Sequence, residues 1–576
     1  GMNGGERLAA VLAAHGVPAL FTLCGGHISP LLVAAKARGI RVVDVRDEAT
    51  AVFAADAIAR LTGTPGVAAV TAGPGLTNAI TALKNAQLAQ SPLVLIGGAA
   101  PTALQGRGAL QDIEQRPLVA PHVKFVRQVR RVVDLGPALT EAFAAAREGV
   151  PGPAFVECPV DLLYDEAVIR QWYVEAAGRG TSVPDRLLRW VLKRHADRLF
   201  KHSAQPAVVR ASEVRVPRAT EGAVGRAAAA LAKAERPLIV VGSQALAQAS
   251  NAARLAAALT RLGAPVYLSG MARGLLGRDH PLQLRHARRD ALRAADCVLL
   301  AGVPCDFRLD YGRHIRRSAT LIAANRGARE ARLNRRPSIA AIGDAGEFIE
   351  RLAAQAGGRA RRPAWIDELR ARDAAREADI DARAAIAGEH VNPVALFRAL
   401  DQIAADDAVF IADGGDFVAT ASYILHPRSP LSWLDPGVFG TLGVGAGFAF
   451  GAALARPAAE RWLIWGDGAS GYGLTELDSF VRHGVPVIAV VGNDASWSQI
   501  AREQVKLLND EVGTALARTA YHEVARGFGA EGFEVRHPRD LEWTLRRARE
   551  AAAAGRPVLV NVWLDKTDFR EGSISM

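Results

Sequence analysis

The sequence has little cysteine, and none of it is spaced to hold a metal or a disulfide framework. Among 576 residues there are four cysteines, Cys24, Cys158, Cys297 and Cys305, and their spacing fits neither use. We interpret them as reduced thiols of a cytosolic protein. A P-loop is also missing, which argues against that means of binding nucleoside triphosphates.

Long apolar runs are scarce as well. The opening residues GMNGGERLAA contain no apolar stretch of the kind that a secretory signal needs. Residues 437–455 are uncharged but include six glycines, so they predict a buried glycine-rich loop and helix, not a membrane span. These features lead us to expect a soluble, cytoplasmic protein.

Aromatic residues make up 6% of the sequence, and arginine is spread widely along it. The formal net charge of +11 favours anionic ligands in general. Basic residues without interleaved aromatics are a poor nucleic-acid surface, so we predict no nucleic-acid partner. Half of the residues are hydrophobic, which allows large cores, and the length is enough for three or four domains.

Three blocks of apolar strands alternating with alanine- and leucine-rich helices predict an α/β protein with three doubly wound parallel sheets. The blocks are residues 1–165, 220–356 and 389–566, with segments 166–219 and 357–388 between them and a tail at 567–576. The expected strands lie near residues 20–23, 41–45, 66–71, 93–97 and 154–157; 238–241, 297–300, 321–324 and 339–342; and 408–412, 463–465, 487–491 and 558–562.

The two connecting segments differ in character. Segment 357–388 is charged and rich in alanine, which predicts a surface helix. Residues 184–202 place leucine, valine and phenylalanine broadly on one helical face and basic residues on the other. Such a helix either packs on its own protein or a neighbouring subunit, or it touches an acidic surface such as a membrane.

The most informative stretch runs from residue 461 to residue 497. A short apolar strand ends at Gly466-Asp467-Gly468, a helix follows, and a second apolar strand ends at Asn493. Two parallel strands joined by a helix end on the same sheet edge, so Asp467 and Asn493 should lie side by side. Their oxygens suit Mg²⁺, and the glycines let backbone N–H groups approach a diphosphate. The alternative is an ordinary polar turn.

Other strand ends carry similar residues. Glu48 follows a strand and begins a helix, where the helix dipole favours its charge, so it also has a purely structural interpretation. Gly73 to Asn78 follow the next strand, at the edge where ligands bind in open α/β sheets. Asp413-Gly414-Gly415-Asp416-Phe417 and Gly440-Thr441-Leu442-Gly443 give the third block two further edges rich in exposed backbone.

Together these motifs resemble the thiamine diphosphate enzymes of the acetolactate synthase superfamily, over the whole chain. The resemblance implies that block one binds the pyrimidine ring and block three the diphosphate and Mg²⁺, with a middle domain between them. It implies that Asp467, Asn493 and the Ala495 carbonyl hold the metal. The cofactor-binding residues that it implies are Glu48, Gly73, Asn78, Gly415, Asp416, Phe417, Gly440, Leu442, Gly468, Ala469, Asn493 and Ser496.

The resemblance also assigns roles. Glu48 matches the glutamate that hydrogen-bonds the aminopyrimidine ring. Leu442 matches the apolar side chain that holds the cofactor in a bent shape. The Gly440 carbonyl matches the acceptor for the amino group of the cofactor. His27 and Gln111 fall where the similar benzaldehyde lyase has an active-site histidine and glutamine. We therefore take both as candidate catalytic residues, although a histidine beside two glycines is often structural.

Within the superfamily the sequence is most similar to the acetolactate-synthase-like 2-hydroxyacyl-CoA lyases. The motifs that carry this are Cys24 to Pro30, Gly108 to Gln111, Gly492 to Ala495 and the tail Thr567 to Ile574. The implied reaction cleaves a 2-hydroxyacyl-CoA to formyl-CoA and an aldehyde or ketone. The alternatives are a carboligase or decarboxylase acting on CoA-free 2-ketoacids or hydroxyketones, and a silent binding subunit.

The sequence differs from acetohydroxyacid synthases at one point in the third block. Where they have a tryptophan after the metal asparagine, this sequence has Ala501-Arg502-Glu503, which argues against a second 2-ketoacid and against an FAD requirement. A nucleotide, either ADP or the end of CoA, remains a possible ligand of the middle domain. Because the family's two cofactor sites meet across a subunit interface, a homodimer or homotetramer is implied.

Overall fold

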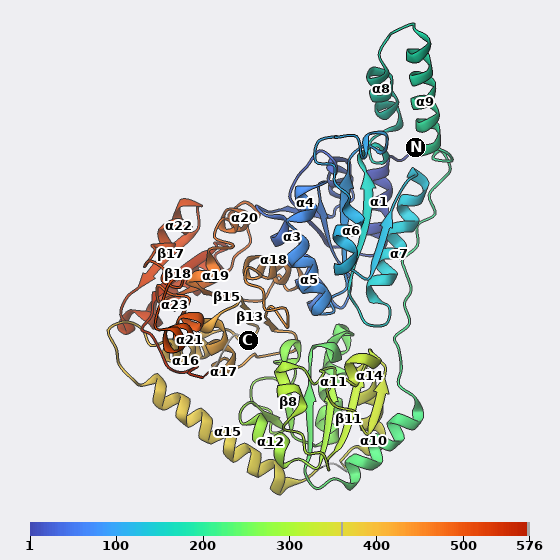
Figure 1. The fold of residues 1–576 in the computed structure, drawn as a ribbon. Coiled ribbons are helices and arrows are strands. Elements are labelled where there is room, and N and C mark those ends of the chain that lie inside the picture. The colour runs from blue at the N-terminus through green and yellow to red at the C-terminus, as the bar shows by residue number, and fades with distance from the viewer. Residues whose placement is uncertain (359–360, 573–576) are drawn as a thin grey trace. The chain divides into compact units, whose positions relative to one another are not determined.

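The computed structural model describes residues 1–358 and 361–572, in which three six-stranded parallel sheets carry the fold (Figure 1). The chain separates into two compact units. The first holds residues 1–59 and 64–215, and the second holds 60–63 and everything from residue 216 onward. The predicted fold class, three α/β domains with parallel sheets, is confirmed.

The first sheet lies in the first unit and has the order β2-β1-β3-β4-β6-β5. Its strands are β1 (Ala19–Thr22), β2 (Arg41–Asp44), β3 (Gly66–Val70), β4 (Leu93–Ala99), β5 (Phe125–Gln128) and β6 (Pro153–Pro159). The accompanying helices are α1 (Gly4–Ala14), α2 (Ser29–Ala37), α3 (Glu48–Thr62), α4 (Pro74–Thr77), α5 (Ile80–Leu88), α6 (Gln115–Val119) and α7 (Leu135–Arg147). All residues of β3, β4 and β6 are buried, because helices cover both faces of a parallel sheet.

The second sheet, in the second unit, has the order β12-β11-β10-β7-β8-β9. Its strands are β7 (Pro237–Val241), β8 (Val266–Leu268), β9 (Gln283–Leu284), β10 (Cys297–Ala301), β11 (Thr320–Asn325) and β12 (Ile339–Ile342). Its helices are α10 (Glu221–Lys233), α11 (Ala252–Leu262), α12 (Arg288–Ala294), α13 (Ala328–Ala331) and α14 (Ala345–Ala356). Cys297 and Cys305 are buried thiols, and burial raises the pKa of each.

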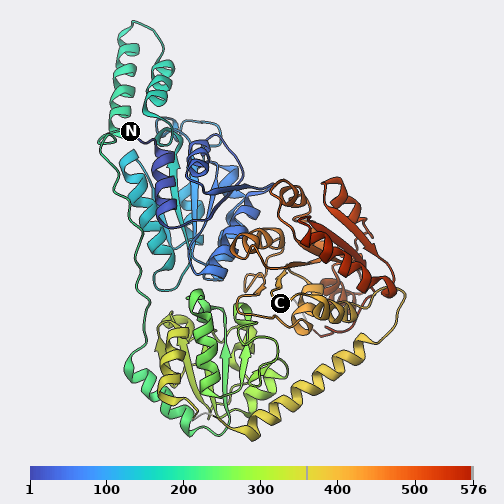
Figure 2. The same cartoon turned by 180° about the vertical axis from the view of Figure 1, so that it is seen from behind.

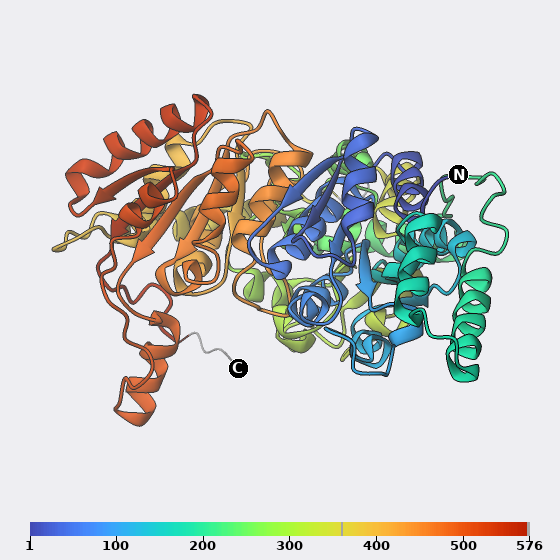
Figure 3. The same ribbon diagram turned by 90° about the horizontal axis from the view of Figure 1, so that it is seen from above.

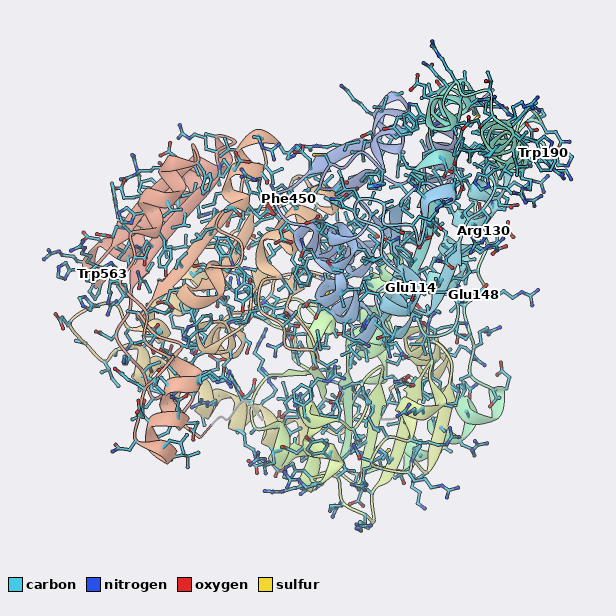
Figure 4. The ribbon with its side chains drawn as sticks, turned by 45° about the horizontal axis from the view of Figure 1, so that its top comes forward. Glu114, Arg130, Glu148, Trp190, Phe450 and Trp563 are labelled. Atoms are coloured by element: carbon cyan, nitrogen blue, oxygen red, sulfur yellow. The ribbon has the colours of Figure 1, made fainter. Side chains whose placement is uncertain are left out.

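The third sheet has the order β14-β13-β15-β16-β18-β17. Its strands are β13 (Val409–Ala412), β14 (Trp433–Leu434), β15 (Arg461–Gly466), β16 (Ile488–Asn493), β17 (Glu531–Val535) and β18 (Val558–Trp563). Its helices are α16 (Pro393–Ile403), α17 (Asp416–Ile424), α18 (Gly445–Ala455), α19 (Asp467–Ser470), α20 (Glu476–Arg482), α21 (Ser498–Leu508), α22 (Tyr521–Gly527) and α23 (Leu541–Ala553). Phe450 of α18 stacks on Phe480 of α20, and Trp563 at the end of β18 lies under Arg518 and Arg536 (Figure 4).

Within the second unit, the long helix α15 (Pro363–Ala384) connects the second and third sheets (Figure 2). Its N-terminal end is anchored where Trp365 Nε1 donates to the Pro237 carbonyl at 2.8 Å. The surface helix predicted for segment 357–388 is therefore present. The tail packs back on this unit through Phe569, which is buried beneath Arg376 and Arg383. Ser573 and Ile574 of the predicted tail motif lie outside the described residues.

The first part of connecting segment 166–219 forms a helical hairpin that projects from the first unit (Figures 1 and 3). Helix α8 (Glu166–Ala177) packs along α9 (Val183–Leu199), and Leu199 and Phe200 at its base are buried. Farther out, Leu188 and Val191 are exposed, and Trp190 lies at the outer side of α9 (Figure 4). The apolar face predicted for residues 184–202 therefore packs on its own chain only at its C-terminal end.

Helix α18 occupies the C-terminal half of the uncharged stretch 437–455, and nearly all of it is buried. Among the described residues, no helix combines the length and the apolar character that crossing a bilayer requires. The glycine-rich loop and buried helix predicted for this stretch are thus present.

Candidate active site

The first unit gathers its predicted residues where the strand order reverses. The chain passes from β1 to β2 on one side and then to β3 on the other, which leaves a crevice at the carboxyl ends of β1 and β3. His27 follows β1 and Thr71 follows β3, and the His27 Nδ1 atom lies 2.9 Å from the Thr71 hydroxyl. Burial lowers the pKa of His27, which favours its neutral form.

Glu48 is the first residue of α3, as predicted, and its side chain is buried. Asn78 Nδ2 donates to Glu48 Oε1 at 3.3 Å. The intervening loop passes close by, since a Cβ atom on Gly75 would lie 3.5 Å from Glu48 Oε2. The predicted residues Glu48 and Asn78 are therefore brought together.

Gly73 and Gln111 meet through their backbones. Both have positive φ, +69° and +62°, and a Cβ atom on Gly73 would lie 2.5 Å from the Gln111 carbonyl oxygen. A left-handed conformation is unusual for glutamine and marks a constrained position. Gln115 Oε1 accepts from the Gly73 N–H at 3.0 Å and so holds the loop. Among the described residues, no hydrogen bond joins Gln111 to His27 or Glu48.

In the second unit, Asp467 and Asn493 lie side by side, as predicted. Parallel strands β15 and β16 pair with Gly466 opposite Gly492, so the next residue of each strand reaches the same edge. Asp467 and Asn493 are both buried. Asp467 Oδ2 and Asn493 Oδ1 are each sealed from solvent and accept no hydrogen bond from the described residues. Two such oxygens at one edge carry a large desolvation cost and call for a cation.

The orientation of Asn493 is fixed from behind. Its Nδ2 donates to the Thr519 carbonyl and to Asn561 Oδ1, both at 3.1 Å. Asn561 is fully buried and in turn donates to the same Thr519 carbonyl at 3.1 Å. With its nitrogen used, Asn493 presents only its oxygen to the edge.

The predicted third ligand, the Ala495 carbonyl, already accepts the Leu516 N–H at 2.8 Å. A carbonyl oxygen has two lone pairs, so one remains for a cation. Ala495 has φ +57°, a left-handed conformation that turns the chain away after Asn493. Ser496, a predicted cofactor-binding residue, is buried, and its hydroxyl donates to the Thr514 carbonyl at 3.4 Å.

Asp413 organises the loop that carries Leu442. Its buried carboxylate accepts the N–H groups of Gly414, Gly443 and Gly445 at 2.7, 2.9 and 2.8 Å. Gly414 must lack a side chain, because a Cβ atom there would lie 2.3 Å from Leu442 Cδ2. Asp413 thus joins the end of β13 to the residues that follow Leu442. Gly440, at the start of this loop, has φ +65°.

The turns whose backbone N–H groups were predicted to hold a diphosphate follow strands β13 and β15. Gly415, with φ +109°, caps α17, and Asp416 begins that helix. Gly468 and Ala469 lie in α19, and a Cβ atom on Gly468 would clash with the Trp497 ring at 2.4 Å. The Phe417 side chain is buried against Gly492, so Phe417 would serve a ligand only through its backbone.

Comparison with known proteins identifies the family. Residues 2–118, 224–352 and 413–562 match the N-terminal, central and C-terminal domains of thiamine pyrophosphate enzymes. Human 2-hydroxyacyl-CoA lyase 2 is 50% identical over all of this chain and 92% of its own length, and the zebrafish (Danio rerio) protein is 49% identical over 100% and 93%. The acetolactate synthase large subunit IlvG of Mycobacterium tuberculosis is 35% identical over 98% and 96%.

The chain belongs to the thiamine pyrophosphate enzymes. Within that family it groups with the 2-hydroxyacyl-CoA lyase 2 proteins, so the predicted resemblance is confirmed. The family's cofactor is thiamine pyrophosphate, also called thiamine diphosphate.

The charges at the strand edge fit the metal-bound diphosphate of a thiamine pyrophosphate enzyme. Burial, and then the neighbouring carboxylate of Asp494, raise the pKa of Asp467, because two buried carboxylates face one another. Among the described residues, no group of three or more His, Cys, Asp or Glu side chains is arranged to hold a metal. The candidate set needs only one carboxylate, an amide and a backbone carbonyl, and hard oxygen ligands of this kind suit Mg²⁺ shared with phosphates.

Sequence reasoning missed four residues that shape the site of this thiamine pyrophosphate enzyme: Thr71, Asp413, Asp494 and Asn561. Three of them sat inside motifs that we had noted, but only as strand ends or backbone-rich turns. Asn561 offered a clearer signal, because it is an amide inside the continuous apolar run Val558–Trp563. A polar residue inside a buried strand must have a partner.

Proposed function

We propose that the protein is a thiamine diphosphate-dependent 2-hydroxyacyl-CoA lyase. The observation that carries this is the 50% identity to human 2-hydroxyacyl-CoA lyase 2 over the whole chain. In the reaction, the bond between C1 and C2 of the 2-hydroxyacyl-CoA breaks. The C2 hydroxyl loses its proton and becomes the carbonyl of an aldehyde or ketone, and C1 gains a proton to leave as formyl-CoA. The reverse reaction condenses formyl-CoA with the aldehyde.

Bound thiamine diphosphate supplies a nucleophilic carbon and an electron sink for the cleaved bond. Glu48 would hydrogen-bond the aminopyrimidine ring and share a proton with it. Its burial and its one hydrogen bond from Asn78 leave Oε2 available for this. Asp467 and Asn493 would hold Mg²⁺ through their two unpartnered oxygens, with the Ala495 carbonyl as a further ligand.

His27 and Gln111 are the proposed substrate-side residues. Thr71 fixes the His27 ring through Nδ1, which leaves Nε2 to exchange a proton or to hydrogen-bond a developing oxyanion. Gln111 is held by its strained backbone against Gly73 and is exposed, so its side-chain amide is free to reach a substrate oxygen.

A carboligase or decarboxylase that acts on CoA-free 2-ketoacids is the second candidate, because the acetolactate synthase relative matches almost the full chain. Two contacts of Arg502 argue against it. Arg502 donates to Asp416 Oδ2 at 2.7 Å and to the Arg570 carbonyl at 3.2 Å. This region of the chain, where acetohydroxyacid synthases have a tryptophan, is thus tied to the start of α17 and to the tail.

We further propose that the enzyme uses Mg²⁺ without FAD, works in the cytoplasm, and assembles as a homodimer or homotetramer. Light scattering on the purified protein tests the assembly state, and metal analysis after dialysis tests the ion.

A product assay tests the function directly. The purified protein, Mg²⁺ and thiamine diphosphate are mixed with a short 2-hydroxyacyl-CoA, and separately with pyruvate, and the products are identified by mass spectrometry. We expect formyl-CoA and an aldehyde from the first mixture and nothing from the second. Acetolactate or acetaldehyde from pyruvate alone would support the second candidate instead.

A further inference from the structure

The second unit contains a cavity of about 740 Å³ that none of the proposed cofactor or metal residues lines. It lies among β8, β9, α12, the turn at residues 306–314, and the helices α15 and α17 (Figure 1). Seven of its lining residues are arginines and two are aspartates. Its size is in the range of about 300–1,000 Å³ that small-molecule sites occupy.

Three of these arginines have no acidic partner. Among the described residues, Arg273, Arg285 and Arg288 form no ion pair, although other arginines of this cavity do. Their printed bonds go to backbone carbonyls: Arg273 Nη1 to Ser422 at 2.7 Å, Arg285 Nη2 to Arg278 at 3.2 Å and Arg288 Nη2 to Arg308 at 2.5 Å. Each guanidinium has five N–H donors, so most of them remain free for a ligand.

The nearby acids are occupied elsewhere. Asp310 pairs with His314 at 3.0 Å and with Arg289 at 3.6 Å. Asp373 Oδ1 accepts the main-chain N–H groups of Arg285 and His286. Asp290 is exposed at the cavity rim. No carboxylate among the described residues that line the cavity therefore forms an ion pair with any of the three arginines, and Asp401 and Glu377, which do not line it, offset part of the charge of Arg285.

Two further observations agree. Arg273 Nε is sealed from solvent and donates no hydrogen bond within the described chain. Burial lowers the pKa of Arg273, Arg285 and Arg288, although arginine stays charged at physiological pH. Burying several cations without an ion-paired carboxylate is costly, and a bound anion would offset that cost.

An aromatic surface adjoins the arginines. Tyr423 of α17 lines the cavity and is 48% exposed. It also contacts the tail, with the Phe569 ring centroid at 6.1 Å and the Arg570 guanidinium at 5.8 Å. A flat ring of this kind is a stacking platform for a nucleobase.

We propose that this cavity binds the 3′-phosphorylated adenosine diphosphate end of the CoA thioester, with its phosphates on Arg273, Arg285 and Arg288 and its adenine against Tyr423. The site lies beside β9, which is the edge strand of the sheet, and its neighbour β8. It is separate from the crevice between β7 and β10, where the strand order of this sheet reverses and a doubly wound domain ordinarily binds a nucleotide. This inference rests on the proposed lyase function and names where its substrate is held.

The test measures binding of CoA, 3′-dephospho-CoA and pantetheine to the enzyme loaded with Mg²⁺ and thiamine diphosphate, by isothermal titration calorimetry. The variants are Arg288→Ala and Arg285→Ala/Arg288→Ala. The matched control is Arg317→Ala, an exposed arginine of the same domain that does not line the cavity. Circular dichroism and the affinity for thiamine diphosphate verify that each variant is folded.

Loss of one charge-assisted contact should weaken CoA binding about tenfold, and loss of two should weaken it about a hundredfold. The preference for CoA over 3′-dephospho-CoA should shrink, pantetheine binding should stay unchanged, and Arg317→Ala should bind CoA like the parent. A folded double variant with the parent's CoA affinity overturns the proposal. So does equal loss for pantetheine, which carries no phosphate.

Failure of the site and failure of the proposed function give different results. If the double variant forms formyl-CoA with an unchanged KM for the CoA thioester, the lyase function stands and the cavity assignment is wrong. If the parent enzyme forms no formyl-CoA and does not bind CoA, the proposed function is wrong and this assignment falls with it. If the parent binds CoA through these arginines without cleaving the thioester, the site stands and the reaction is wrong.

Discussion

The side-chain amide of Asn493 donates to Oδ1 of Asn561 at 3.1 Å, and this bond, together with the one from the same nitrogen to the Thr519 carbonyl, decides which end of the amide faces the strand edge. We expect Asn561→Leu to leave the Asn493 amide held by the Thr519 carbonyl alone and to weaken Mg²⁺-dependent thiamine diphosphate binding about tenfold, as loss of a supporting hydrogen bond does at metal sites. Thermal-shift titrations with and without Mg²⁺ measure this. An unchanged Mg²⁺ requirement would contradict the positioning role.

Removal of the charge on Glu48 should stop the chemistry and keep the cofactor. Glu48→Gln keeps the shape of the side chain, and we expect turnover to fall by about 10² or more because a shared proton is lost. The neighbouring Asp47→Asn is the matched control: Asp47 is exposed and only caps the Ala49 N–H. Near-normal turnover of Glu48→Gln, with thiamine diphosphate still bound, would remove Glu48 from the mechanism.

Asp467→Asn should have opposite effects on the free and the loaded protein. The change removes one of two facing buried carboxylates, so the free protein should melt at the same or a higher temperature. The stabilisation by thiamine diphosphate and Mg²⁺ together, about 2.7 kcal/mol at a hundredfold excess over Kd for the parent, should be lost. Differential scanning calorimetry measures both states. Full retention of the ligand-induced shift would refute the metal assignment.

His27 should affect turnover without affecting the cofactor. We expect His27→Asn to lower kcat about tenfold or more, with the affinity for thiamine diphosphate unchanged, because His27 lies on the substrate side of the proposed mechanism. Thr71→Val removes the hydroxyl that fixes the ring and should give a smaller loss in the same direction. His202→Asn, an exposed histidine of the same unit, serves as the control. Normal kcat would make His27 purely structural.

The pH dependence of stability should reveal a buried cluster around His426, whose Nδ1 lies 2.7 Å from Asp401 Oδ2 and whose Nε2 lies 3.4 Å from Glu377. Burial alone would lower the pKa of His426, but these two carboxylates raise it. Burial would also raise the pKa values of Glu377 and Asp401, and their hydrogen bonds lower them instead. Other charged groups of the cluster are His286, Arg278, Arg285, Arg398 and Arg428.

Because the folded pKa of His426 lies above its unfolded value of about 6.5, its stabilisation is complete below that pH and is lost as the pH rises. The two carboxylates act in the opposite sense, and their stabilisation is lost as the pH falls below about 4. We expect His426→Gln to melt about 2–4 °C lower at pH 6, with the difference shrinking toward pH 9. A constant difference across this range, or an equal effect of the exposed His537→Gln, would contradict the assignment.

The central strands other than β8, and the edge strands β2 and β12, could be predicted from the sequence, whereas the other short or half-exposed strands could not. Strands β3, β4, β10 and β15 are apolar runs buried on both faces, and each was expected within a residue or two. Strands β5, β8, β9, β14 and β17 were missed. All of them except β8 lie at the edges of their sheets. They are short or half-exposed: β8 has three residues, and β9 and β14 have two each. A half-exposed strand has no continuous apolar run to signal it.

Some residues of the candidate site could also be predicted from the sequence, and others could not. Asp467, Asn493 and Glu48 were predictable because each stands at a strand end beside a glycine-rich turn or a helix start. Their supporting residues were not, since Asp413, Asn561 and Thr71 act through hydrogen bonds to residues far away in the chain. The sequence predicted only a possible nucleotide ligand of the middle domain and not the arginine-lined cavity, because the arginines come from separate elements that the fold brings together.

The pairing of Gly466 with Gly492 has a consequence for distant relatives. The alignment of Asp467 with Asn493 depends on where two adjacent strands end, and the chain between them only has to cross from one strand to the next. Insertions in that crossover would leave the two oxygens where they are, whereas a one-residue slip of either strand would turn one of them away. A search for remote members of this group should therefore hold the two strand ends fixed and let the distance along the chain vary.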